Sequence, residues 1–176
     1  MEVKAKCKYD YEAIKALTRL LFSGKRNPKT IFAVNLILQA AVLILIIIKA
    51  IYSSNNKEWL FFAIWLLLVI ITVYCYYILP RIRYNALAKL KNTENDFVFC
   101  DSFMKIISNG FGLSGQTEIQ YSTLVKVYET SKYFFVYQMK NSVIIVDKST
   151  VTDGLPEDIR NRLQAFLGDK YYICKY

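Results

Sequence analysis

The chain contains no histidine among its 176 residues. Histidine is the commonest general base near neutral pH and a frequent zinc ligand, so its absence removes most catalytic triads and most zinc sites. The four cysteines are also poorly placed for metal binding, because no two of them have the spacing of metal ligands, and we expect reduced structural thiols. We therefore predict a noncatalytic protein with no catalytic, cofactor-binding or metal-ligating residues and no cofactor.

Glycine is scarce, with six residues in all, yet three of them form a nucleotide-like motif. In "GFGLSG", Gly110, Gly112 and Gly115 fit the pattern G-x-G-x-x-G. A dinucleotide site needs this loop to open a helix, whose N-terminus holds the pyrophosphate. The residues that follow, "QTEIQY", alternate in polarity as a strand does. We interpret the motif as a β-turn.

Convergent carboxylates, the other usual mark of a catalytic site, are not evident either. Glu118, Glu129, Asp147 and Asp153 lie in segments that read as strands or turns. Charged side chains in such segments most often lie on solvated faces. We expect all four to be exposed.

Charged residues are nearly missing from two long apolar segments. Residues 31–52 and 59–79 each contain more than twenty residues, most of them aliphatic or aromatic. As helices they would measure about 32 Å, the thickness of the hydrocarbon layer of a bilayer. Only six residues separate them, so the two predicted membrane spans form an antiparallel hairpin over residues 31–80.

Polar residues inside the two spans are predicted to meet. If the turn centres near residue 55, residues whose numbers sum to about 110 lie at equal depth. Asn35 and Gln39 should then face the second helix and form hydrogen bonds there, unless they face a partner protein. The candidate partners within the second span are Thr72, Tyr74 and Tyr76.

Basic residues gather on the same side of both spans. They form a predicted basic collar of Lys25, Arg26, Lys29, Arg81, Arg83, Lys89 and Lys91. By the positive-inside rule both termini are cytoplasmic, and residues 53–58 face outward. The net charge of +9 is explained by this collar beside an anionic leaflet, so no nucleic-acid partner is expected.

The first 30 residues combine a strand with an amphipathic helix. Residues 2–10 alternate in polarity, and Asp10 can cap a helix that ends at Gly24. The helix either lies along the cytoplasmic interface or packs against the soluble domain. A lone strand leaves its backbone groups unpaired, so we predict that it joins the sheet of residues 96–148. Its inward residues would be Val3, Ala5, Cys7 and Tyr9.

The remainder of the chain is rich in short strands. Residues 81–95 are predicted as a helical extension and linker, with Pro80 bending the helix without ending it. Residues 96–176 contain six β-branched or aromatic runs separated by turn residues, then an amphipathic helix after Pro156. The expected fold is an α+β membrane protein, a transmembrane hairpin plus a small antiparallel β-barrel or sheet capped by the C-terminal helix.

Several of these strands resemble a known family. The glycine turn, "YSTLVKVYET", "YFFVY" and "VIIVDK", following a two-span hairpin, resemble the YcxB-like family of bacterial membrane proteins. The sequence departs from that family at Val146, Asp147 and Lys148, where Ile-Pro-Lys is usual. The resemblance implies a soluble part like a pleckstrin-homology (PH) domain and a place in the bacterial cytoplasmic membrane, and it supplies no catalytic residues.

These observations predict a noncatalytic, membrane-anchored interaction or regulatory module. Its expected partners are the lipid bilayer and either another protein or a second copy of the chain. Two alternatives remain, an immunity protein against a toxin and an accessory subunit of a transport or signalling complex. Specific head-group binding by the β domain is less favoured, because the loop near Gly110 offers only Lys105.

Overall fold

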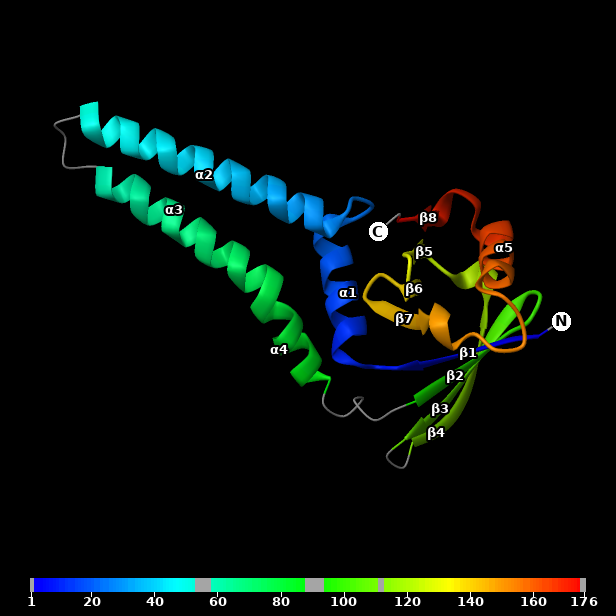
Figure 1. Cartoon of the computed structure of the whole chain (residues 1–176). Coiled ribbons are helices and arrows are strands. Elements are labelled where there is room, and N and C mark those ends of the chain that lie inside the picture. Colours follow the sequence, from blue (N-terminus) through cyan, green and yellow to red (C-terminus); the bar gives the residue numbers. More distant parts are fainter. Residues whose placement is uncertain (1, 53–57, 88–93, 111–112, 175–176) are drawn as a thin grey trace.

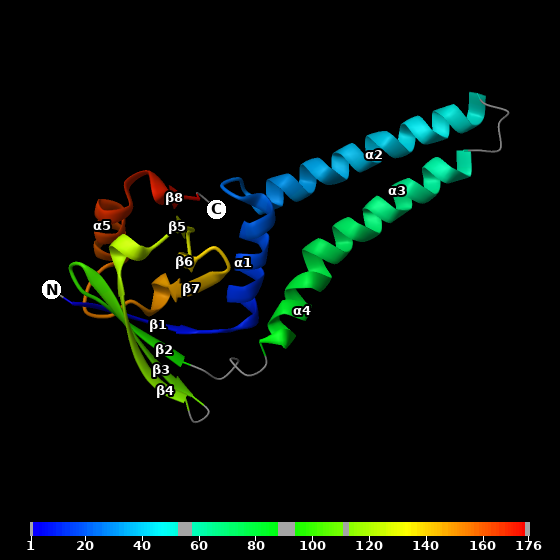
Figure 2. The same cartoon turned by 180° about the vertical axis from the view of Figure 1, so that it is seen from behind.

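The computed structural model describes residues 2–52, 58–87, 94–110 and 113–174. A hairpin of long helices projects from a mixed α+β domain, which we call the β domain (Figure 1). Seen from behind, helix α1 stands between the hairpin and the strands (Figure 2). The end of the hairpin next to the β domain is called its root below.

The hairpin consists of two long apolar helices. Helix α2 runs over Pro28–Tyr52, and α3 over Glu58–Val73 continues through a π turn, Tyr74–Ile78, into α4, Leu79–Ala86. Both Pro28–Tyr52 and Trp59–Ala86 are long and apolar enough to cross a membrane, and none of their most apolar stretch is buried within the protein. Their apolar side chains therefore lie on the outer surface of the hairpin.

The second helix continues past its proline. Pro80 has no N–H to donate and its ring would crowd the carbonyl one turn earlier, so a regular α-helix cannot continue unchanged through it. The preceding turn is wound as a π-helix, in which the Leu79 N–H bonds to the Tyr74 carbonyl. The helix then reaches Ala86, which agrees with the prediction that Pro80 does not end it.

The N-terminal segment forms strand β1, Val3–Lys8, and helix α1, Tyr11–Ser23. The Asp10 carboxylate accepts the Ala13 N–H at 2.7 Å, and Gly24 ends the helix with φ of 58°. Ala13, Ile14 and Leu20 are buried in the core of the β domain. Of the two alternatives for this helix, the structure has it packed against the β domain.

Helix α1 also contacts the hairpin. The Tyr11 ring meets the Tyr84 ring of α4 edge-on, with centroids 5.8 Å apart. Leu21 and Phe22 of α1 are each about half exposed. Leu20 and Ser23 on either side of them are buried, so Leu21 and Phe22 lie on a face of α1 that the core does not cover.

Strand β1 joins a four-stranded antiparallel sheet across the hairpin. The order is β1-β2-β3-β4, with β2 over Glu94–Phe99, β3 over Phe103–Gly110 and β4 over Leu113–Gln120. Val3 pairs with Phe99 and Lys8 with Glu94, which confirms the predicted pairing of the N-terminal strand. Val3 and Ala5 are buried, and Tyr9 is half-buried. The β domain is therefore discontinuous in sequence.

The boundary before this sheet differs from the sequence prediction. β2 begins at Glu94, whereas residues 81–95 were assigned to a helical extension and linker. Asn95 is 7% exposed and pairs with Cys7. A polar "ENDF" reads as a loop by composition, but the ladder with β1 makes it a strand.

The second sheet has the order β7-β6-β5-β8. Its strands are β5, Lys126–Glu129, β6, Tyr133–Met139, β7, Ser142–Asp147, and β8, Tyr171–Ile173. β8 was not predicted, because three residues carry no measurable periodicity, and it pairs parallel to β5. The described residues form two sheets and no closed barrel, so of the two expected forms, barrel or sheet, the barrel is wrong.

The core lies between the two sheets and is closed by helix α5, Pro156–Leu167. Ile159, Leu163 and Leu167 of α5 are buried, as the helical spacing predicts. Phe166 is half exposed and packs instead on Tyr121, with ring centroids 5.4 Å apart. The short connections are 3-10 turns at Tyr121–Thr123, Lys148–Thr150 and Gly168–Lys170.

Candidate functional site

A buried carboxylate at the end of β5, that of Glu129, accepts hydrogen bonds from three side chains. Glu129 is 1% exposed, so the expectation that it lies on a solvated face is wrong. It follows Val127 by two residues, and in a strand residues two apart share a face. Val127 is fully buried, so the alternation that identified the strand also places Glu129 inward.

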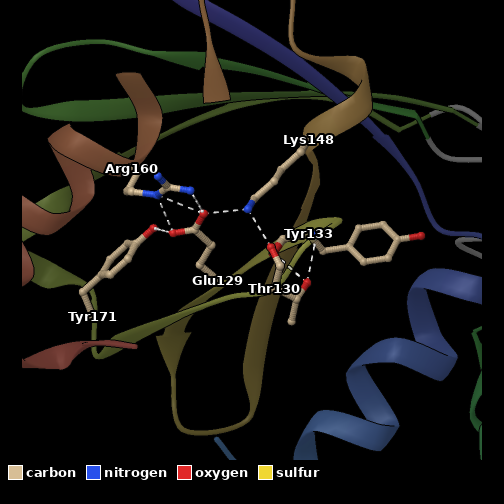
Figure 3. A network of polar contacts seen from close by, with 6 residues as sticks. All are labelled: Glu129, Thr130, Tyr133, Lys148, Arg160 and Tyr171. Atoms are coloured by element: carbon tan, nitrogen blue, oxygen red, sulfur yellow. Dashed lines mark hydrogen bonds and ion pairs between the residues drawn. The ribbon is translucent and has the colours of Figure 1, made fainter. Parts of the chain in front are cut away.

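Three elements supply donors to this carboxylate (Figure 3). Arg160 of α5 donates from Nε to Oε2 at 2.9 Å and from Nη2 to Oε1 at 2.5 Å. The Lys148 Nζ, just after β7, lies 2.6 Å from Oε1, and the Tyr171 hydroxyl of β8 donates to Oε2 at 2.6 Å. One side chain thus connects β5 to the helix, to β7 and to the unpredicted strand β8.

The electrostatics of this cluster keep Glu129 charged. Burial alone would raise its pKa, but hydrogen bonds from Arg160, Lys148 and Tyr171 prevail and lower the pKa to about 2. Burial and the adjacent carboxylate raise the pKa of Tyr171. Because Glu129 stays ionised at neutral pH and both oxygens already accept hydrogen bonds, this arrangement holds a charge and suits structural support better than proton transfer.

The other carboxylates considered above do not converge. Glu118 pairs with Lys105 at 3.3 Å on the exposed face of β3 and β4, and Asp153 pairs with Lys4 at 3.0 Å. Asp147 accepts hydrogen bonds from the backbone N–H and hydroxyl of Ser149. Within the described part of the chain, no group of three metal-ligating side chains comes together.

The glycine motif lies at the β3–β4 hairpin. Gly110 ends β3 and pairs with Leu113, the first residue of β4, while residues 111–112 lie outside the described residues. The segment after the motif is a strand, as the alternation predicts, so no helix N-terminus is available there for a pyrophosphate.

Three of the polar residues predicted inside the hairpin meet. The Gln39 Nε2 donates to the Thr72 hydroxyl and to the Asn35 Oδ1, both at 2.8 Å. The Thr72 hydroxyl lies 3.3 Å from the Asn35 Oδ1. In addition, the Trp65 indole N–H donates to the Gln39 carbonyl at 2.9 Å. We call Asn35, Gln39 and Thr72 the hairpin polar cluster.

The two tyrosines named with this cluster are placed differently. The Tyr76 ring stacks on Phe32 with centroids 4.2 Å apart, and Tyr74 is 42% exposed. The prediction that residues whose numbers sum to about 110 lie at equal depth assumed a regular α-helix. The π turn begins at Tyr74 and rotates the side chains from there on around the helix axis. Thr72 precedes that turn and keeps its predicted position.

The basic collar is largely exposed at the root of the hairpin. Arg26, Lys29 and Arg81 are exposed, and Arg83 is half-buried. The Lys25 ammonium lies 3.8 Å from the centre of the Tyr172 ring of β8. Lys89 and Lys91 lie outside the described residues.

We expect Gln39→Leu to weaken the pairing of α2 with α3 by about 1 to 2 kcal/mol. The substitution removes the hydrogen bond to Thr72 of α3 and the one to Asn35 of α2, both in an apolar setting. The measurement is reversible unfolding of the full chain in bicelles, followed by circular dichroism. Ile37→Leu is the matched control, since Ile37 is 68% exposed and apolar. If Gln39→Leu leaves the hairpin unchanged but disrupts oligomers, the polar cluster serves a partner instead.

Two long apolar helices joined to a discontinuous α+β domain define the class of this protein, a small domain carrying a hairpin suited to a membrane. Residues 106–162, from β3 into α5, match the family model for YcxB-like protein, about a third of the chain. This match confirms the predicted resemblance to the YcxB-like family. Searches of curated proteins and of solved structures found no match to this chain.

Proposed function

We propose that this protein is a noncatalytic, membrane-anchored interaction or regulatory module of the YcxB-like type. The observation that carries this proposal is the pairing of β1 with β2 across the hairpin. Two strands that form one ladder must lie on the same side of a membrane, so the hairpin between them enters and returns. The β domain is thereby held directly at the bilayer surface.

The location proposed is the bacterial cytoplasmic membrane, with both termini in the cytoplasm. The exposed basic residues Arg26, Lys29 and Arg81 lie on elements at the root of the hairpin, beside the β domain. Lysine and arginine favour the cytoplasmic side of a span and attract anionic lipids there. Two packed sheets with a helix across one end also support a PH-like arrangement for the β domain.

The noncatalytic role is supported by how the ionisable groups are used. Glu129 is fully engaged by Arg160, Lys148 and Tyr171, and Glu118 and Asp153 form separate exposed pairs. An active site usually combines convergent polar groups with space for a substrate. The chemistry available to these groups is that of structural support and of surface contacts with a partner.

Cysteine labelling tests the proposed topology. In a chain whose four native cysteines are replaced, Tyr52→Cys at the end of α2 should react with a membrane-impermeant maleimide in intact cells, because Tyr52 is 88% exposed and distal to the root. Ser122→Cys, exposed in the β domain, is the control and should react only after permeabilisation. The reverse pattern would contradict cytoplasmic termini.

The interaction role is tested by cross-linking in cells followed by extraction in a mild detergent. We expect a defined complex, either a homo-oligomer or a stoichiometric assembly with another protein. A stable membrane partner would favour the accessory-subunit alternative, and sensitivity of a deletion strain to a neighbouring toxin would favour the immunity alternative. A chain that stays monomeric and uncross-linked in cells would contradict the proposal.

A further inference from the structure

A cavity of about 210 Å³ lies at the root of the hairpin, where α1 meets α2 and the π turn. Arg19 and Phe22 of α1 line it, together with Ile31 and Phe32 of α2 and Ile71 of α3. The π turn contributes Tyr76 to the wall. π turns in long helices are frequently found at functional sites, and here the turn faces a cavity.

One charged side chain, that of Arg19, borders this cavity with one of its hydrogen-bond donors unused. The Nε of Arg19 is buried and has no hydrogen-bond partner. The guanidinium carbon of Arg19 lies 4.4 Å from the centre of the Tyr76 ring, which fixes the group against the π turn. A buried N–H without an acceptor is unfavourable, and a guanidinium suits phosphate oxygens best.

The rest of the lining is mostly apolar. Ile31 and Phe32 begin the apolar run of α2, and Ile71 lies opposite them before the π turn. Ile71 is 48% exposed and Phe22 is 55% exposed, so the cavity is open at the outer surface of the hairpin. A molecule that fits has an anionic end at Arg19 and an apolar end directed along the hairpin.

We propose that this cavity binds one anionic phospholipid of the surrounding bilayer, its phosphate at Arg19 and the upper part of an acyl chain against Phe32 and Ile71. The proposal rests on the membrane location proposed above. Both ends of the ligand are specified by the site, because Arg19, the one cation among the described lining residues, lies at the root and the apolar residues lie toward the bilayer. This differs from general attraction to the basic collar, which needs no cavity.

Native mass spectrometry of the full chain, purified in a neutral detergent, tests the site. Phosphatidylglycerol and phosphatidylcholine with the same acyl chains are added in equal amounts, and the bound lipid is counted. We expect the wild type to retain one phosphatidylglycerol in about tenfold preference, and Arg19→Gln to lose that preference. Lys140→Gln is the matched control, because it removes the same charge from an exposed side chain outside both the cavity and the basic collar, and it should keep the preference.

A second variant tests the apolar end without changing charge. Ile71→Trp replaces an aliphatic side chain at the cavity wall with a larger indole ring and should reduce retention of both lipids several-fold. The melting temperature without lipid shows whether each variant folds. Equal retention of the two lipids by the wild type, equal losses in Arg19→Gln and Lys140→Gln, or full retention by Ile71→Trp would each overturn the proposal.

The outcome is separable from that of the membrane location. Flotation of the full chain with cell membranes and the labelling of Tyr52→Cys decide the location without reference to Arg19. A protein that inserts correctly but shows no lipid preference refutes the cavity proposal alone. A protein that fails to float refutes both.

Discussion

Replacing Glu129 with alanine is expected to lower the free energy of unfolding of the β domain by about 3 to 5 kcal/mol. The substitution leaves Arg160, Lys148 and Tyr171 without their shared acceptor, and it removes the side chain that connects α5 and β8 to β5. Chemical unfolding of the full chain in bicelles, followed by near-ultraviolet circular dichroism, measures the change. The matched control is Glu118→Ala, a strand glutamate whose ion pair is exposed, with an expected loss below about 0.5 kcal/mol.

The pH dependence of the stability difference between the wild type and Glu129→Gln identifies the electrostatic part of the Glu129 contribution. The pKa of Glu129 is lowered from an ordinary 4.5 to about 2, so its ionic stabilisation is complete above pH 4.5 and is lost as the pH falls toward 2. This lowering of the pKa corresponds to about 3 kcal/mol of stabilisation of the folded protein. The gap in stability between the wild type and Glu129→Gln should therefore narrow between pH 5 and pH 3. A gap that stays constant over this range would mean that packing, not charge, accounts for it.

Loss of β1 should prevent the β domain from folding as a soluble monomer. Without residues 2–24, the paired edge of β2 opens and Val3 and Ala5 leave the core, which costs roughly 2 to 4 kcal/mol in burial alone. Helix α1 leaves with them and uncovers more core. We expect residues 94–176 alone to aggregate through the open edge.

Fusing residues 2–24 to residues 94–176 through a flexible linker should restore a monomer, as judged by light scattering and by dispersion of the amide NMR spectrum. The control fusion carries Val3→Asp and Ala5→Asp, which keep the length but place charges in the core. A well-dispersed monomeric spectrum from residues 94–176 alone, with no gain from either fusion, would show that β1 is dispensable.

Much of the local structure was predictable because it is encoded by neighbouring residues. Asp10 and Gly24 bound α1 by capping, and the apolar period of residues 156–168 defines α5. The alternation in residues 2–10 indicated a strand, and the need of its backbone for partners predicted β1 in the sheet. The alternation in residues 126–129 likewise contained the signal for a buried Glu129, which a general preference for exposed carboxylates outweighed.

The sequence by itself determined which segments become long apolar helices, which become strands and where most of them end, because hydrophobic period and capping act within a few residues. Only the tertiary structure decided how β8 pairs with β5, how Arg160 and Tyr171 reach Glu129, and how the π turn sets Arg19 against Tyr76. These contacts join residues from 31 to 57 positions apart, or depend on one extra residue in a helical turn. Their geometry follows from packing between elements, which no local pattern records.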